Sequence, residues 1–227
     1  MRDARTETTR TVTLEPFEIG RTTVTVNSRP VHPVTWFDAV TWCNIASMDA
    51  GLNAAYRVAG RRVEWLVEAD GYRLPTEAEW EFACRAGTSE PTYGPLEDIA
   101  WTAIDSVAGA QDVALKAPNA FGLFDTIGNV WEWCWDYADT ARYSDYRSLR
   151  GGGWADPAYS CRASVRRGSA PDAVLEDVGF RVARGAVGVA GEFAAQGWSR
   201  EADRLRAYTR GPLPVGWTPL RELPDPA

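Results

Sequence analysis

Histidine is nearly absent from this chain: His32 is the single one among 227 residues. Metal sites and acid–base catalysis near neutral pH usually recruit histidines in pairs or clusters. The scarcity argues against a zinc site, a non-haem iron triad and a helical His-x-x-x-His site. A Ser-His-Asp or Cys-His triad would have to pass every proton through His32, and Pro33 directly after it favours an extended loop residue instead.

Cysteine and positive charge are also scarce. The four cysteines, Cys43, Cys84, Cys134 and Cys161, form no Cys-x-x-Cys pair, which argues against a zinc ribbon and a thioredoxin-like motif. The formal net charge is −7. Because affinity for a phosphate backbone comes from clustered cations, we expect no nucleic-acid partner.

Long apolar runs are missing. No stretch approaches the roughly 18 apolar residues of a spanning helix, and the polar start has no apolar signal-peptide core. We therefore expect a soluble, cytoplasmic protein without a membrane partner. The length suits one large domain with an appendage.

Two segments carry clear helix signals. Thr35 and Asp38 resemble a capping box ahead of apolar residues at helical spacing, which predicts a helix that ends near Gly51. Thr76 and Glu79 form a regular capping box, and the helix that follows should end at the next glycine.

Strand signals are short. β-Branched residues predict strands at 11–14 and within 17–26, and the segments 55–58 and 63–67 predict a hairpin. From residue 88 to about 184 the helical period gives way to loops with short aromatic strands. In 130–135 the tryptophans alternate, so they should point to one face of a sheet and belong to the core.

Four motifs then occur in order along the chain. They are residues 71–87 (GYRLPTEAEWEFACRAG), 119–133 (NAFGLFDTIGNVWEW), 149–154 (LRGGGW) and 178–182 (VGFRV). Together they resemble the formylglycine-generating enzyme, or sulfatase-modifying factor, family over about residues 10–184. The resemblance implies an α+β, C-type-lectin-like fold, loop-rich, with short antiparallel strands and two main helices.

The same resemblance suggests two regions. Residues 1–184 would form the formylglycine-generating-enzyme-like domain. Residues 185–227 would form a C-terminal extension with a short helix near 199–208 and a Pro-rich tail.

The family's copper site is incomplete here. In the active oxidases, two cysteines five residues apart follow a Gly-Gly-Ser turn and bind copper as thiolates, which suits soft Cu(I). In residues 151–161 (GGGWADPAYSC), Asp156 occupies the first cysteine position. Counted from the turn, the second position falls on Cys161; counted back from residues 169–172, it falls on Ala158. At most one thiolate remains, so copper is not expected.

Cys161 therefore has two readings. It is the catalytic candidate if the chain is an oxidase. In the shorter register it is a neighbour for Cys84, a position that is a structural disulfide partner in some relatives.

Calcium is the metal that the resemblance still implies. The family's second calcium site would be formed by the side chains of Asp125 and Glu132 and the backbone carbonyls of Gly128 and Val130. Oxygen donors in a glycine-containing loop suit a hard cation. The alternative is that Glu132 only bonds a neighbouring turn and the loop folds without metal.

The glycine turn lines the family's substrate groove. We therefore predict that Trp154 contacts a ligand and that Asp156, Arg162 and Arg166 rim the groove; the alternative is that these charges are merely solvated.

Two functions remain. The first is a non-catalytic module that binds a peptide or protein partner, or acts as an accessory protein. The second is a formylglycine-type oxidase that uses Cys161 to convert a peptide cysteine with copper and oxygen. The family's iron-dependent relatives use histidines from a further domain, and its retroelement-diversified relatives have an asparagine-rich variable segment. Neither feature is found here.

Overall fold

The structure, a computed structural model, describes residues 1 and 9–220. Its strands are β1 (Glu18–Ile19), β2 (Thr25–Val26), β3 (Arg29–Pro30), β4 (Tyr56–Ala59), β5 (Arg62–Trp65), β6 (Tyr72–Arg73), β7 (Trp131–Tyr137), β8 (Arg147–Arg150), β9 (Arg166–Ser169), β10 (Val178–Gly179), β11 (Ala183–Arg184), β12 (Ala194–Ala195) and β13 (Trp198–Ser199). The helices are α1 (Trp36–Asp49), α2 (Glu77–Arg85), α3 (Leu96–Ile99) and α4 (Arg200–Ala207), with 3-10 turns at Ala103–Asp105 and Ala158–Ser160. The fold is thus α+β and loop-rich, as predicted.

Both long helices begin at the predicted caps. The Thr35 hydroxyl accepts from the Asp38 N–H at 3.1 Å, and the Asp38 carboxylate accepts from the Thr35 N–H at 3.2 Å. Thr76 and Glu79 repeat this reciprocal pair at the start of α2. Each pair satisfies donors that a helix N-terminus leaves without intrahelical partners, so the local signal was sufficient.

The strand predictions were right in part. β4 and β5 pair as the expected hairpin, with Ala59 opposite Arg62 across a two-residue turn. Within 17–26 only β1 and β2 form, two residues each. The predicted strand at 11–14 is wrong. The backbone there joins no ladder, and next to it the Glu15 N–H donates to the Gln196 side chain at 2.8 Å.

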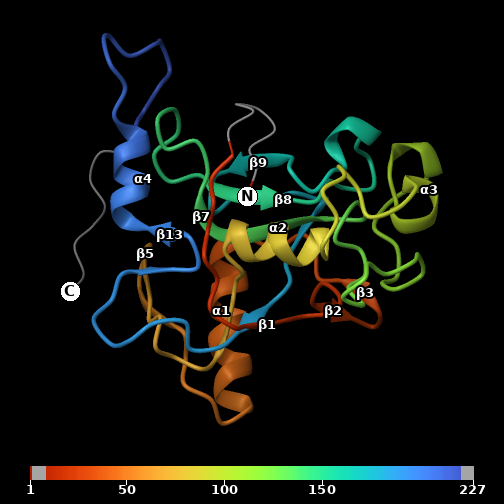
Figure 1. The fold of residues 1–227 in the computed structure, drawn as a ribbon, viewed down its shortest axis with the longest axis horizontal. Helices are drawn as coiled ribbons and strands as arrows, with labels where there is room; N and C mark the ends of the chain where they lie inside the picture. The colour runs from red at the N-terminus through yellow and green to blue at the C-terminus, as the bar shows by residue number, and fades with distance from the viewer. Residues whose placement is uncertain (2–8, 221–227) are drawn as a thin grey trace.

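The largest sheet has the order β10-β7-β8-β9, with β7 parallel to β10 and antiparallel to β8. Alternation along β7 works as predicted, because Trp131, Trp133 and Trp135 all belong to the main core cluster. The opposite face of the strand is buried too. Cys134 lies there in a second cluster with Trp80 of α2, and Figure 1 shows α2 lying across this part of the sheet.

Aromatic rings gather around Trp135. Tyr56 stacks on it at 5.1 Å between ring centroids, and Trp36 and Trp198 each lie 5.4 Å away. Trp198 comes from β13, so the segment after residue 185 contributes to the main core. The chain returns there to place β13 and α4 beside β5 (Figure 1).

The predicted C-terminal helix is confirmed as α4, with Ser199 as its N-cap. The last seven residues of the predicted Pro-rich tail, 221–227, lie outside the described residues. Among the helices that are described, none is long and apolar enough to cross a membrane.

Candidate functional site

The glycine turn after β8 is held close to Cys161. Gly151 and Gly152 have φ of +101° and +84°, a region that side chains rarely adopt. A Cβ at Gly152 would lie 2.7 Å from the Cys161 Sγ. Glycine is therefore required there both by the backbone and by the close approach of the thiol.

Asp156 braces this turn. Its Oδ2 accepts from the Trp131 indole N–H at 2.6 Å and from the Gly153 N–H at 2.9 Å. The Asp156 carboxylate thus ties the turn to β7. Sequence reasoning singled out Asp156 but missed this bond, because its partner lies 25 residues away.

Cys161 is a buried thiol. Its side chain has 0% exposure, and burial, with a smaller contribution from the Asp156 charge, raises its pKa to about 12. Cys84 lies in the same core cluster, and burial raises its pKa to about 12 as well. All four cysteines are free, so the Cys84–Cys161 disulfide is not formed. One buried thiol beside a carboxylate does not fit a two-thiolate copper site.

The four predicted ligand contacts have different partners in the structure. Trp154 is half-buried, and its indole N–H has no hydrogen-bond partner. The Nε–H of Arg162 donates to the carbonyl of Tyr159 at 2.7 Å, within the same loop. Arg166 lines a cleft that the other three do not line, and its Nε–H donates to Glu77 of α2 at 2.9 Å.

Glu132, a predicted calcium ligand, is bonded to a buried arginine. Its two oxygens accept from Arg181 at 2.7 Å each, and one of them also accepts from the Trp80 indole N–H at 2.6 Å. Both charged side chains of the pair are fully buried. The negative charge of Glu132 is therefore already compensated by protein.

Asp125 offers a better oxygen. Its Oδ2 accepts from the Ala114 N–H at 2.8 Å, but its Oδ1 is buried without a partner. Burial raises the pKa of Asp125 in spite of that hydrogen bond and of the Arg181 charge. Of the predicted set, Asp125 fits a hard cation, whereas Glu132 would have to share its oxygens with Arg181. Within residues 1 and 9–220, no group of three or more His, Cys, Asp or Glu residues could hold a metal.

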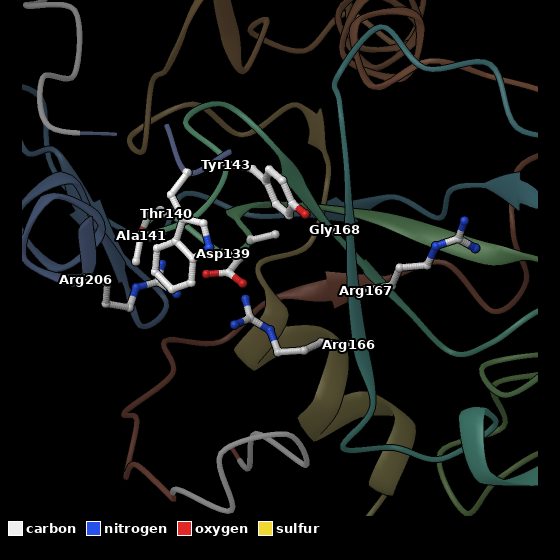
Figure 2. Close-up of a pocket in the computed structure, with 10 residues that line it drawn as sticks. Asp139, Thr140, Ala141, Tyr143, Arg166, Arg167, Gly168 and Arg206 are labelled. Atoms are coloured by element: carbon white, nitrogen blue, oxygen red, sulfur yellow. The ribbon is translucent and has the colours of Figure 1, made fainter. Parts of the chain in front are cut away.

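A cleft of about 370 Å³ lies between the sheet and the C-terminal segment (Figure 2). Its lining residues are Ala138, Asp139, Thr140, Ala141, Tyr143, Arg166, Arg167, Gly168, Arg206 and Trp217. Asp139 and Arg166 point toward each other in Figure 2, whereas Arg167 turns away. Of these, the sequence analysis found only Arg166, since most of the other residues, from Ala138 to Tyr143 and in the C-terminal segment, are distant in sequence and share no motif with it.

A second cavity of about 190 Å³ shares Arg166 and Arg206 with this cleft. Buried acids line it. Burial, and then the charges of Glu77 and Asp203, raise the pKa of Asp136 to about 7. Burial opposes the ionisation of Glu77, but Arg166 and Arg150 outweigh it and lower the pKa of Glu77. The two neighbouring acids therefore titrate in different pH ranges.

The short strands, the two capped helices and the braced glycine turn define an α+β fold of the formylglycine-generating-enzyme type. A family model described as a sulfatase-modifying factor enzyme 1-like domain matches residues 25–186. The chain therefore belongs to the formylglycine-generating enzyme, or sulfatase-modifying factor, family.

Three relatives illustrate the range of similarity. The solved structure of Treponema denticola variable protein 1 superposes with a TM-score of 0.70 at 30% identity, covering 76% of this chain and 86% of that one. Inactive C-alpha-formylglycine-generating enzyme 2 of Bos taurus is 34% identical, over 69% of this chain and 50% of its own length. Chaperone protein LppX of Paenibacillus barcinonensis is 29% identical, over 76% of this chain and 81% of its own length. The chain thus spans only half of the bovine relative.

Proposed function

We propose that this chain is a non-catalytic member of the family that binds a peptide or protein partner as an accessory module. The observation that carries the proposal is the pair formed by Asp156 and Cys161. Counted from the glycine turn, the first position of the family's thiolate pair would fall on Asp156, a carboxylate that braces the turn, and the second on Cys161, a buried thiol.

The chemistry of copper explains why this matters. A thiolate, rather than a thiol, is the metal ligand, and Cu(I) favours soft sulfur donors. A pKa of about 12 keeps Cys161 protonated at neutral pH. The carboxylate of Asp156 is a hard donor, and its Oδ2 already accepts two hydrogen bonds. These residues supply neither the donors nor the open access that the oxidase reaction needs.

Two relatives agree with this proposal by name. The bovine protein is called inactive, and LppX is called a chaperone protein. Both names fit a scaffold that is retained for binding.

Partner contact is proposed at the loop that carries Trp154 and Arg162. Trp154 is partly exposed and its buried indole N–H has no partner, and the Tyr159 side chain beside Arg162 is 70% exposed. Aromatic and arginine side chains of this kind are typical of binding hot spots. Asp156 would act indirectly, by holding the turn.

The catalytic alternative has a direct test. The protein is incubated with copper, oxygen and a Cys-x-Pro-x-Arg peptide, and mass spectrometry follows the conversion of thiol to aldehyde. We expect no conversion. Turnover that disappears in Cys161→Ser would overturn the proposal and establish the oxidase.

The binding surface is tested with a matched pair of variants. Trp154→Ala should reduce partner capture at least tenfold, roughly the effect of losing one hot-spot aromatic. Tyr208→Ala removes a ring that is 62% exposed from the end of α4, away from this loop, and should leave capture unchanged. Equal capture by both variants would place the interface elsewhere.

We also propose that Asp125, with the carbonyls of Gly128 and Val130, holds a structural calcium ion. The unpartnered Oδ1 of Asp125 supports this, and Glu132 would join only by sharing its oxygens with Arg181. Calcium should raise the melting temperature above that measured in EDTA, and Asp125→Asn should abolish the difference. Identical melting temperatures in calcium and in EDTA would mean that the loop folds without metal.

A further inference from the structure

A small cavity lies at the seam between the sheet and the C-terminal segment. Its volume is about 20 Å³, and its walls include Arg62 of β5, Trp135 of β7, Arg147 of β8, and Trp198 and Arg200 on either side of the N-cap of α4. Three guanidinium groups and the positive end of a helix therefore meet at one point. The cavity is separate from the glycine turn and from the larger cleft.

Two N–H groups of the wall have no acceptor. The Nη2 of Arg62 is buried without a hydrogen-bond partner. The Nε1 of Trp135 is also buried and unpartnered, on a side chain that is 2% exposed. Unsatisfied buried donors are costly and uncommon in native structures, and each calls for an explanation such as a bound ion.

Protein compensates the charge of Arg147 only in part. That charge interacts with Asp203, but the Asp203 carboxylate is already bonded to the Trp198 indole N–H and to Arg206. Arg147 is 5% exposed, and its Nη1 donates to the Trp135 carbonyl at 2.6 Å. Its guanidinium carbon lies 3.9 Å from the centre of the Trp36 ring and 3.8 Å from that of Tyr137. In the described part of the chain, neither Arg147 nor Arg62 pairs with a carboxylate. Ring faces compensate such a cation only in part.

We propose that this cavity binds a single monoatomic anion of chloride size, held by Arg62, Arg147 and the indole N–H of Trp135. The volume admits one such particle. A water molecule would bring two hydrogens that need acceptors, while the Trp135 carbonyl already accepts from Arg147. An anion satisfies the donors and the excess charge together. It also links β5, β7 and β8 to the segment that carries Trp198.

The first experiment locates the ion directly. Crystals of the full chain are grown or soaked in bromide, and anomalous scattering is recorded at the bromine edge. We expect a peak in this cavity, within hydrogen-bond distance of Arg62 and Trp135. A peak confined to surface arginines, with water in the cavity, would overturn the proposal.

The second experiment measures linkage in solution. At constant ionic strength, chloride and bromide should raise the melting temperature above that in gluconate, saturably and by roughly 3 °C for an ion present well above its Kd. Formate and phosphate are measured in the same way, as oxyanions for comparison with the halides. Stabilisation by these alone, without a halide effect, would mean an oxyanion site and would contradict the monoatomic assignment.

Variants assign the effect to the cavity. Arg62→Gln keeps a polar side chain on the surface of the hairpin, removes the charge and should weaken bromide affinity at least tenfold. Arg204→Gln makes the same charge change on α4, away from the lining residues, and should bind like the wild type. An equal loss of bromide affinity in both variants would mean that halides act only by nonspecific screening of charge.

Discussion

Three buried arginines in the described part of the chain are neutralised by acids. Arg181 bonds Glu132 at 2.7 Å, Arg73 bonds Glu79 at 2.7 Å, and Arg150 approaches Glu81 at 2.5 Å. Breaking such a pair leaves one charge buried and uncompensated, which costs far more than losing an exposed pair. The single residues that matter most for stability are therefore found among these acids.

Glu132→Gln tests this at one carboxylate. Arg181 would lose its counter-charge while its guanidinium stays buried, so we expect the free energy of unfolding to fall by about 3–5 kcal/mol. Urea denaturation measures it.

The control is Glu18→Gln, because the Glu18 carboxylate pairs with Arg184 at the surface. That change should cost less than about 1 kcal/mol. Similar losses in the two variants would mean that the buried pair contributes no special stability.

At the scale of elements, the sequence predicts what neighbouring residues determine, such as helix starts, but not what distant residues determine, such as strand order. The capping boxes at Thr35 and Thr76 were predictable because their partners lie three residues away. The order of the sheet was not predictable, because no local pattern in the sequence specifies that β7 pairs with β10 and β8. The same limit applied to the sites, where Asp156 was found but its bond to Trp131 was missed.

The cleft was missed for a related reason. Arg206 and Trp217 come from the C-terminal segment, while Tyr143 follows β7. No sequence pattern connects these positions, and their meeting depends on how the segment after 185 packs. A sequence motif can predict a turn, but a cleft between distant segments can be found only in the folded structure.

The cap of α2 also links that segment to the domain. The Thr76 hydroxyl accepts from the Glu79 N–H at 3.2 Å and donates to the Gln196 carbonyl at 2.9 Å. Thr76→Ala should lower the free energy of unfolding by about 1–2 kcal/mol, because the cap is lost and a buried carbonyl loses its donor.

Chemical denaturation checks this prediction against Thr41→Ala. The Thr41 hydroxyl lies on the exposed side of α1 and bonds only the Phe37 carbonyl of its own helix, at 2.9 Å. That variant should stay within about 0.5 kcal/mol of the wild type. A Thr76 variant as stable as the Thr41 variant would contradict the role of the cap.

At the scale of the whole molecule, the C-terminal segment shares the core of the domain. Trp198 packs against Trp65 and Trp135, and its indole N–H donates to Asp203 of α4 at 2.7 Å. The acids beneath α4 couple this packing to pH. Asp136 faces Glu77 of α2 and both Asp203 and Arg206 of α4, and it accepts the Glu77 N–H at 2.8 Å.

The raised pKa of Asp136 sets the direction of that pH dependence. Its pKa of about 7 in the folded protein lies above the ordinary value of 3.8, so between these limits the folded state keeps a proton that the unfolded chain releases. The contribution of this carboxyl to stability is therefore complete at acid pH and is lost as the pH rises toward 7. Asp136→Asn does not titrate, so from pH 5 to 8 it should gain roughly 2 kcal/mol of stability relative to the wild type.

Unfolding free energies measured across this pH range decide the point. Asp172→Asn is the control, because Asp172 is exposed and its hydrogen bond with Arg61 lowers its pKa, so it titrates below this range. The free energy of unfolding of this variant should change with pH in the same way as that of the wild type from pH 5 to 8. If that of Asp136→Asn also changed in this way, the proton at the contact between α2 and α4 would belong to Asp203 or Glu77 rather than to Asp136.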